Sequence, residues 1–280
     1  MRVYLGTGGY SNPDWQGLLY PDWMKKNDAL TVYRQAFDVV ELNSSFYAIP
    51  GEKAFAGMLA KSAGQVRFAV KLHQDFTHRR EYDADLVARM RQSPQPLREA
   101  GVLGPLLAQF PYSFPRTPAN RQYLAQLVAD FAGAPLAVEF RHISWHLGTV
   151  QAAFAQQGLI WVSVDYPPLA GMPVADLVLT QRTGYIRLHG RNEAQWWEGK
   201  SASERHDYCY REDELRRWAD RIIARRDDCD VLYVLFENTT QGHALHNIPV
   251  LRQMLRDAGL AVGSGLDEQP VSLASRLLRP

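Results

Sequence analysis

The chain has 280 residues, 46% of them hydrophobic, and is therefore long enough to bury a large core. Its 31 basic and 30 acidic side chains nearly cancel, so net charge gives no reason to expect a nucleic-acid or anionic-membrane partner, and two cysteines provide neither a disulfide framework nor a CxxC metal site. No uncharged apolar run approaches the ~20 residues of a membrane span and no signal peptide opens the chain, so a cytoplasmic protein without a membrane partner is expected.

Short apolar runs alternate with helix-length segments along the chain. In chain order we predict a strand at 2–5, a glycine-rich turn at 6–9, a helix at 28–37, a strand at 39–46, a helix at 52–62, a strand at 66–72, a helix at 84–91, a strand at 103–110, a helix at 120–131, a strand at 136–140, a helix at 148–157, strands at 160–164 and 185–188, a helix at 212–226, a strand at 231–236 and a helix at 248–258.

Parallel strands need such crossovers, so this alternation favours an α/β protein. We predict a single (β/α)8 TIM barrel over residues 1–262, followed by a C-terminal tail at 263–280. A doubly wound open sheet is the alternative. It would gather its ligand groups at one switch point, whereas polar residues here end many different strands.

Charged and polar residues stand near the C-terminal ends of these strands. Because side chains alternate between faces, residues i and i+2 share a face. The pairs that share a face are Glu41 with Asn43, Lys71 with His73, Glu139 with Arg141, and Arg187 with His189. Asp165 ends its own strand. The opposite faces are apolar and are expected to pack against helices: Val40, Leu42, Val70, Leu72, Val138, Phe140, Val162, Val164, Ile186 and Leu188.

These strand ends resemble the YecE-like family, a domain of unknown function with a TIM-barrel fold. The resemblance covers roughly Arg2 to Leu255 and rests on Gly6-Thr7-Gly8-Gly9-Tyr10, Asp14-Trp15, Leu19-Tyr20-Pro21, Val40-Glu41-Leu42-Asn43-Ser44-Ser45-Phe46-Tyr47, Phe68-Ala69-Val70-Lys71, Thr77-His78, Gln109-Phe110-Pro111, Val138-Glu139-Phe140-Arg141-His142 with Trp145, Arg187-Leu188-His189-Gly190-Arg191, and Phe236-Glu237-Asn238 with Gly242, Ala244 and Asn247. Glu237 departs from the family, where Asn is expected. The resemblance implies the fold but no settled reaction. Related barrels include sugar isomerases and metal-dependent endonucleases.

A set of basic side chains should converge at the mouth of such a barrel. Arginine recognises phosphate or carboxylate with two parallel hydrogen bonds, and lysine adds a point charge. Backbone N–H groups of Gly190 or of the 6–9 turn could complete an anion site. The alternative is a buried ion network in which the bases neutralise Glu41, Glu139 and Asp165. The two interpretations are compatible.

The acidic residues could transfer protons or bind a divalent cation. Arg141 follows Glu139 on the same face and should keep it ionised. His189 is the best candidate for proton transfer. No HxxxH-type spacing occurs and the nearby bases would repel a cation, so no metal ligand is assigned, a divalent metal is not favoured, and the cofactor stays unknown. The histidines expected in loops or on the surface are His146, His206, His243 and His246.

Three functional hypotheses follow. The first is an enzyme that binds a small anion, such as a sugar phosphate, and acts by proton transfer or hydrolysis. Its predicted catalytic residues are Glu41, Glu139, Asp165 and His189, and its predicted ligand-binding residues are Asn43, Lys71, Arg141, Arg187, Arg191 and Asn238. The second is a nucleic-acid-binding or processing barrel, in which the same bases hold phosphates and mouth aromatics stack on bases. The third is a non-catalytic ligand-binding protein.

Overall fold

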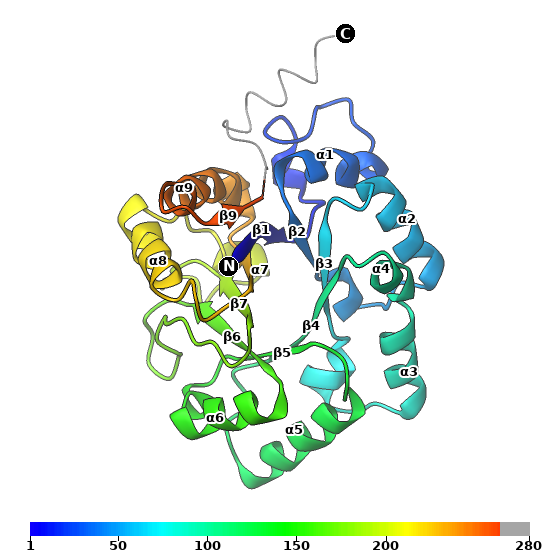
Figure 1. Ribbon diagram of the computed structural model, residues 1–280, viewed down its shortest axis with the longest axis vertical. Helices are drawn as coiled ribbons and strands as arrows, with labels where there is room; N and C mark the ends of the chain where they lie inside the picture. Colours follow the sequence, from blue (N-terminus) through cyan, green and yellow to red (C-terminus); the bar gives the residue numbers. More distant parts are fainter. Residues whose placement is uncertain (264–280) are drawn as a thin grey trace.

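The computed structural model describes residues 1–263, which form a closed barrel of parallel strands surrounded by helices (Figure 1). The strands are β1 (Arg2–Gly8), β2 (Val39–Leu42), β3 (Arg67–Lys71), β4 (Leu103–Phe110), β5 (Leu136–Phe140), β6 (Ile160–Asp165), β7 (Thr183–Leu188), β8 (Val231–Phe236) and β9 (Ala261–Val262). Neighbours pair in chain order from β2 to β8, and β1 closes the ring by pairing with β8 and β2. The predicted (β/α)8 barrel is confirmed. The short β9 adds to the start of β1. Residues 264–280 of the predicted tail lie outside the described residues.

The helices occupy the crossovers between strands and form the outer layer in Figure 1. They are α1 (Ala29–Ala36), α2 (Glu52–Ser62), α3 (Ala84–Gln92), α4 (Gln95–Glu99), α5 (Pro118–Asp130), α6 (Gly148–Gln157), α7 (Ala202–Arg205), α8 (Glu212–Ala224) and α9 (His243–Asp257). Single turns of 3-10 helix lie at Pro13–Trp15, Lys26–Asp28, Ser44–Phe46, Ile143–Trp145 and Thr240–Gly242, and a π-helical turn at Asp75–Arg79. The prediction missed α4 and α7, which are too short to show a helical period.

The side chains of the strands divide into two apolar layers. The outer layer lies between strands and helices and includes Val40, Leu42, Val70, Leu72, Val138, Phe140, Ile186 and Leu188, as predicted. The inner layer fills the barrel. Val162 and Val164 belong to this inner layer, so their predicted contact with helices is wrong. The neighbouring Asp165 therefore points outward, away from the interior of the barrel.

The predicted glycine-rich turn at 6–9 is also wrong, because β1 continues to Gly8 and only Gly9 has a left-handed backbone, with φ +89°. A Cβ atom at Gly8 would lie 2.3 Å from Oε2 of Glu237, so glycine makes room for that carboxylate. The backbone N–H of Thr7 donates to the Tyr33 hydroxyl, and that of Gly9 donates to the carbonyl of Glu41. These two groups are thus already used within the protein.

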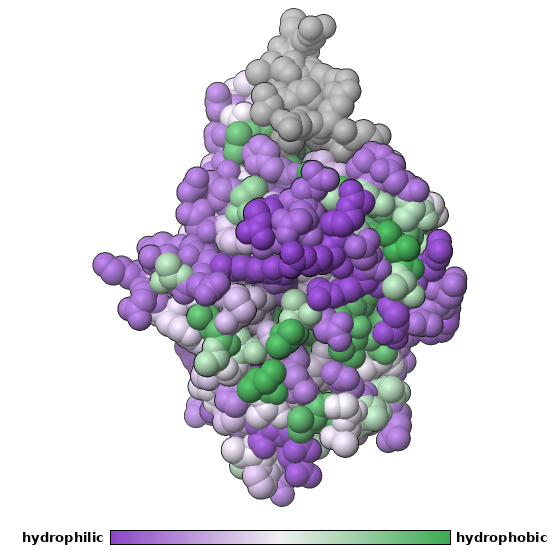
Figure 2. Space-filling view, turned by 90° about the vertical axis from the view of Figure 1, so that its left-hand side faces the viewer, coloured by the Kyte–Doolittle hydropathy of each residue, from purple (hydrophilic) through white to green (hydrophobic). Residues whose placement is uncertain are grey.

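The face that carries α8 and α9 is mostly hydrophilic, with small separated apolar spots (Figure 2). The amphipathic α8 explains part of this pattern, because Leu215, Trp218 and Ile222 are buried while the charged residues of the helix face outward. Among the described residues, no helix combines the length and the apolar character that crossing a bilayer requires.

Candidate functional site at the mouth of the barrel

A cavity of about 300 Å³ opens at the C-terminal end of the barrel strands. Its walls come from the ends of β2, β3, β4, β5, β7 and β8, from the turns after β2 and β3, and from the segment around α7. The lining residues are Asn43, Phe46, Tyr47, Lys71, His78, Gln109, Arg141, Arg187, His189, Ala202, Arg205, His206 and Glu237. In TIM barrels this end of the strands carries the active site.

The floor of the cavity is an ion network centred on Arg187, which is 2% exposed. Its guanidinium binds Glu41 with two parallel contacts, Nη2 to Oε1 at 2.7 Å and Nε to Oε2 at 2.9 Å. Nη1 donates to Oε2 of Glu139 at 2.5 Å, and Nη2 lies 3.0 Å from Oε2 of Glu237. Nη1 also lies 3.3 Å from Nε2 of His189. Four contacts to carboxylate oxygens and one to His189 thus surround this guanidinium.

This arrangement brings the predicted Glu41, Glu139, Arg187 and His189 together and includes the buried ion network that the sequence left as one alternative. The donors of Arg187 are occupied by the protein, so its geometry is that of a group that holds three carboxylates in place. Glu41 also accepts from the Tyr185 hydroxyl at 2.8 Å, and Glu139 accepts from the Tyr166 hydroxyl.

The protonation states of the network follow from burial and charge. Burial would raise the pKa of Glu139, but the positive charge of Arg187 and contact with His189 hold that pKa well below its ordinary value, so the group is ionised. Burial lowers the pKa of His189 to about 3, against the attraction of Glu139. Nε2 of this neutral ring lies 3.3 Å from Nη1 of Arg187 and 3.5 Å from Oε1 of Glu139, and Nδ1 has no hydrogen-bond partner in the described protein.

Three further cations line the cavity. Lys71, Arg141 and Arg205 come from β3, from the end of β5 and from α7. In the described chain, Arg141 has a carboxylate partner, Glu139, at 3.7 Å, whereas Lys71 and Arg205 have none in ion-pair contact. Burial and the like charge of Arg141 lower the pKa of Arg205. Burial, then the charge of Arg187, lower the pKa of Lys71 to about 8.

The cavity also collects buried polar atoms that have no hydrogen-bond partner within the described protein. They are Asn43 Oδ1, Gln109 Nε2, Arg141 Nε, His189 Nδ1, Arg205 Nε and Glu237 Oε1. A buried polar group without a partner costs about 1–3 kcal/mol, so their gathering in one cavity indicates a place where a polar ligand would supply the partners.

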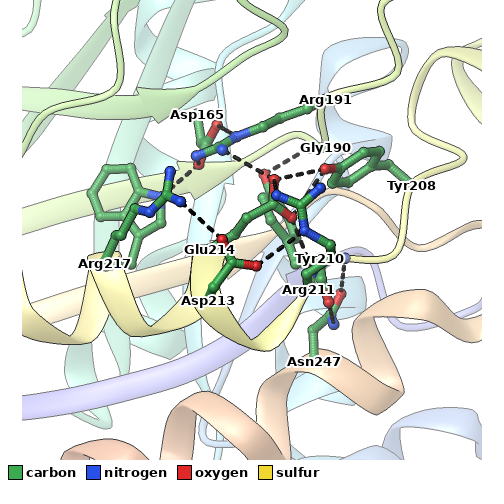
Figure 3. A network of polar contacts seen from close by, with 11 residues as sticks. Asp165, Gly190, Arg191, Tyr208, Tyr210, Arg211, Asp213, Glu214, Arg217 and Asn247 are labelled. Carbon is green, nitrogen blue, oxygen red and sulfur yellow. Dashed lines mark hydrogen bonds and ion pairs between the residues drawn. The ribbon is translucent and has the colours of Figure 1, made fainter.

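Two predicted site residues, Asp165 and Arg191, lie in a second polar network between the strands and α8 (Figure 3), and a third, Asn238, contacts Asn247 of that network. The two oxygens of Asp165 accept from Nε and Nη2 of Arg191, both at 2.8 Å, and Oδ2 also accepts from Nε1 of Trp218 at 2.5 Å. Asn238 donates to Oδ1 of Asn247 at 2.9 Å. Asp165, Arg191 and Asn238 do not line the cavity, because they point outward from the barrel or are engaged by the loop before α8.

The same network holds the segment between β7 and α8. Nη1 of Arg191 lies 3.1 Å from Oε1 of Glu214, which also accepts from the Tyr208 hydroxyl at 2.8 Å. The backbone N–H of Gly190 donates to the Tyr210 hydroxyl at 2.8 Å, so this amide is not available for the predicted anion site. Both ends of the segment that carries Arg205 are thus tied to α8 and to one another.

Comparison with known proteins decides the family. The family model described as "Protein of unknown function DUF72" matches residues 4–271. The chain belongs to the DUF72 family. This is the YecE-like family that its motifs resemble.

The DUF72 chain is 27% identical over 269 residues to the UPF0759 protein YunF of Bacillus subtilis (strain 168), covering 90% of this chain and 94% of that protein. Its fold is similar to the crystal structure of a DUF72 family protein from Thermotoga maritima MSB8, with a TM-score of 0.83, 33% identity and coverage of 91% and 100% of the two chains. A DUF72 family protein from Enterococcus faecalis V583 shares the fold, with a TM-score of 0.81, 23% identity and coverage of 91% and 95%.

The cavity of this DUF72 protein contains residues that the sequence analysis did not assign to the site. Glu237, noted there only as a departure from the family, follows β8 and shares its inward face with Leu235, so strand parity could have found it. Gln109 on β4 follows the same rule. His206, expected in a loop or on the surface, lines the cavity from a loop near His189, and no strand pattern indicates that position.

His78 reaches the cavity from the π-helical turn Asp75–Arg79, a rare local structure that is frequent at functional sites. Its ring packs edge-on against Phe46, with centroids 4.8 Å apart. Within residues 1–263, no group of three or more His, Cys, Asp or Glu side chains has the arrangement of a metal site.

The buried groups at this mouth predict that stability falls as pH drops below neutral. The pKa of His189 is about 3 in the folded protein and ordinarily 6.5, so its contribution is fully present above about pH 6.5 and is lost as pH falls toward 3. The shifted pKa of Glu237 changes stability in the opposite direction. Burial, opposed by Arg187, raises its pKa from 4.5 to about 7, so its contribution is present below 4.5 and is lost as pH rises to 7.

Urea unfolding at about pH 7 and about pH 5 measures this balance. We expect a smaller free energy of unfolding at the lower pH, because His78, whose pKa burial lowers to about 4, and His206, whose pKa burial also lowers, act in the same direction as His189 and together outweigh Glu237. His189→Gln should reduce the difference between the two values, and Glu237→Gln should enlarge it because the opposing contribution is removed. The same difference in all three proteins would contradict this electrostatic account.

Proposed function

We propose that this DUF72 barrel binds a small phosphate- or carboxylate-bearing molecule in the mouth cavity and acts on it by proton transfer. The observation that carries the proposal is the set of Lys71, Arg141 and Arg205 around one cavity of about 300 Å³, two of them without a carboxylate in ion-pair contact in the described chain. An anion bound among these cations would offset the repulsion between their like charges.

The remaining polar atoms favour a ligand with hydroxyl or carbonyl groups besides its charge. Gln109 Nε2 offers a donor, Asn43 Oδ1 and Glu237 Oε1 offer acceptors, and His189 Nδ1 offers one or the other according to its tautomer. A sugar phosphate or a hydroxy or oxo acid presents both kinds of group. The cavity volume lies at the lower end of the range for small-molecule sites, which fits a metabolite of that size.

Proton transfer is supported by Glu237. Its pKa of about 7, raised by burial, lets the carboxyl group exchange a proton near neutral pH, which is the condition for an efficient general acid or base. Its Oε1 has no partner in the described protein, and its Oε2 is held by Arg187. One oxygen is therefore fixed while the other is available to a ligand.

Calorimetric titration with inorganic phosphate and with sugar phosphates tests binding. We expect Arg141→Gln and Arg205→Gln each to weaken binding at least tenfold, because each removes a charged hydrogen bond. The matched control is Arg182→Gln, which removes an exposed arginine paired with Asp230 and should leave affinity unchanged. Equal affinity in all four proteins would overturn the proposed site.

A second measurement separates this proposal from the other hypotheses. Binding of short oligonucleotides in preference to sugar phosphates, with a steep loss of affinity as salt rises, would favour a nucleic-acid partner. Deuterium incorporation from heavy water into a bound sugar phosphate, lost in Glu237→Gln, would support proton transfer. Tight binding without exchange or turnover would support a non-catalytic ligand-binding protein instead.

A further inference from the structure

Among the described residues that line the mouth cavity, one carries a primary amine. Lys71 stands at the C-terminal end of β3 and points into the barrel, where its side chain lines the cavity. Its Nζ lies 4.6 Å from the ring centroid of Phe46 and makes no hydrogen bond or ion pair within residues 1–263. Because the cation–π contact with Phe46 uses one side of the amine, its N–H groups on the opposite side remain available to a ligand.

Local structure holds Lys71 in this position. The Ser45 hydroxyl contacts the carbonyl oxygens of Leu42 and Lys71 at 2.7 Å and 2.6 Å, which ties the ends of β2 and β3 together. The 3-10 turn Ser44–Phe46 then places the Phe46 ring beside the lysine. The amine therefore sits at a defined point of the cavity wall and not at the end of a freely moving chain.

We propose that Lys71 is the nucleophile that forms a Schiff base with an aldehyde or ketone bearing a phosphate or carboxylate group. This inference rests on the proposed anion site, in which Arg141 and Arg205 would hold the charged end of the ligand. The amine lone pair attacks the carbonyl carbon, a C–N bond forms and the oxygen takes a proton to give a carbinolamine. Water then leaves, so that a protonated amine and a carbonyl yield a protonated imine and one water molecule.

Two features of the site serve this step. Burial and the charge of Arg187 lower the pKa of Lys71 to about 8, so a useful fraction of the amine is neutral near physiological pH. Glu237, with its pKa of about 7, can give a proton to the carbinolamine hydroxyl and take one back. The charged and titratable groups whose fields act at Lys71 or that line its cavity are Glu41, Tyr47, His78, Glu139, Arg141, Arg187, His189, Arg205, His206 and Glu237.

Reductive trapping tests the inference on the wild-type protein. The protein is incubated with dihydroxyacetone phosphate or with pyruvate, reduced with cyanoborohydride and mapped by peptide mass spectrometry. The chain has six lysines, so Lys25, Lys26, Lys53, Lys61 and Lys200 serve as internal references. We expect the adduct on Lys71 at least tenfold above Lys53, an exposed residue of α2, with the preferred probe showing whether phosphate or carboxylate is recognised. Lys71→Arg should abolish the adduct and Lys53→Arg should not.

The pH dependence gives a second readout. Trapping at Lys71 should level off above about pH 8, whereas trapping at Lys53 should keep rising toward the ordinary lysine pKa of ~10.4. Adducts spread evenly over the lysines, or none on Lys71, would overturn the Schiff base. Titration of the same preparation with inorganic phosphate separates the two proposals. Phosphate binding without a Lys71 adduct would contradict only the role of Lys71 as nucleophile. Absence of both would contradict the anion site as well.

Discussion

Replacing Arg187 with methionine is expected to destabilise the protein by about 3–5 kcal/mol near neutral pH, because it leaves buried carboxylates without their counter-charge. Glu41 and Glu139 are fully buried and Glu237 is 8% exposed, and all three contact this one guanidinium. Methionine fills much of the same space, so most of the loss would be electrostatic. Urea unfolding at about pH 7 gives the free energy directly.

The control for this variant is Arg141→Met, which removes an arginine from the same cavity. Arg141 is partly exposed and 3.7 Å from Glu139, so its removal should cost less than about 1 kcal/mol. The loss caused by Arg187→Met should also shrink below about pH 4, where protonation removes the repulsion among the carboxylates. An effect no larger than that of Arg141→Met, or one independent of pH, would show that Arg187 does not organise the site.

The second large effect is expected for Asp165→Asn, which should cost about 2–3 kcal/mol because it removes one of the two buried carboxylates that pair with Arg191 and leaves Glu214 alone to balance its charge. The carboxylate is fully buried, and its two oxygens accept three hydrogen bonds, from Arg191 and from Trp218. An amide can accept with only one of its two terminal atoms. The free energy of unfolding again measures the loss.

This variant should also weaken phosphate binding, although Asp165 does not line the cavity. Arg191 and Glu214 anchor the segment that carries Arg205, so loosening them displaces one cation of the proposed anion site. The matched control is Asp213→Asn, a neighbouring carboxylate in Figure 3 that is 51% exposed and pairs with Arg211 and Arg217. It should leave both the free energy of unfolding and phosphate binding nearly unchanged, because exposed ion pairs contribute little. Weaker phosphate binding in Asp213→Asn than in Asp165→Asn would contradict the assigned roles.

The order of apolar and polar residues along the chain was sufficient to predict the barrel and the charged residues at the C-terminal end of its strands. The alternation of apolar runs with helical periods requires parallel strands joined by crossovers, and the structure has that topology. Within a strand, side chains alternate strictly, so Glu41, Glu139 and Arg187 could be assigned to one inward face from their positions alone. Local geometry of this kind depends on near neighbours in the chain, which is why it can be read without a structure.

The sequence pattern could not predict which face of β6 points into the barrel, or which carboxylates pair with each arginine. Trp161 is as apolar as Val162 and Val164, so either face of this strand could have faced the helices, and the valines in fact fill the barrel while Asp165 meets α8. Which of several nearby carboxylates Arg187 binds depends on the tilt and closure of the barrel. His206 reaches the cavity only because a long segment is folded back by contacts with α8, and such contacts join residues distant in sequence.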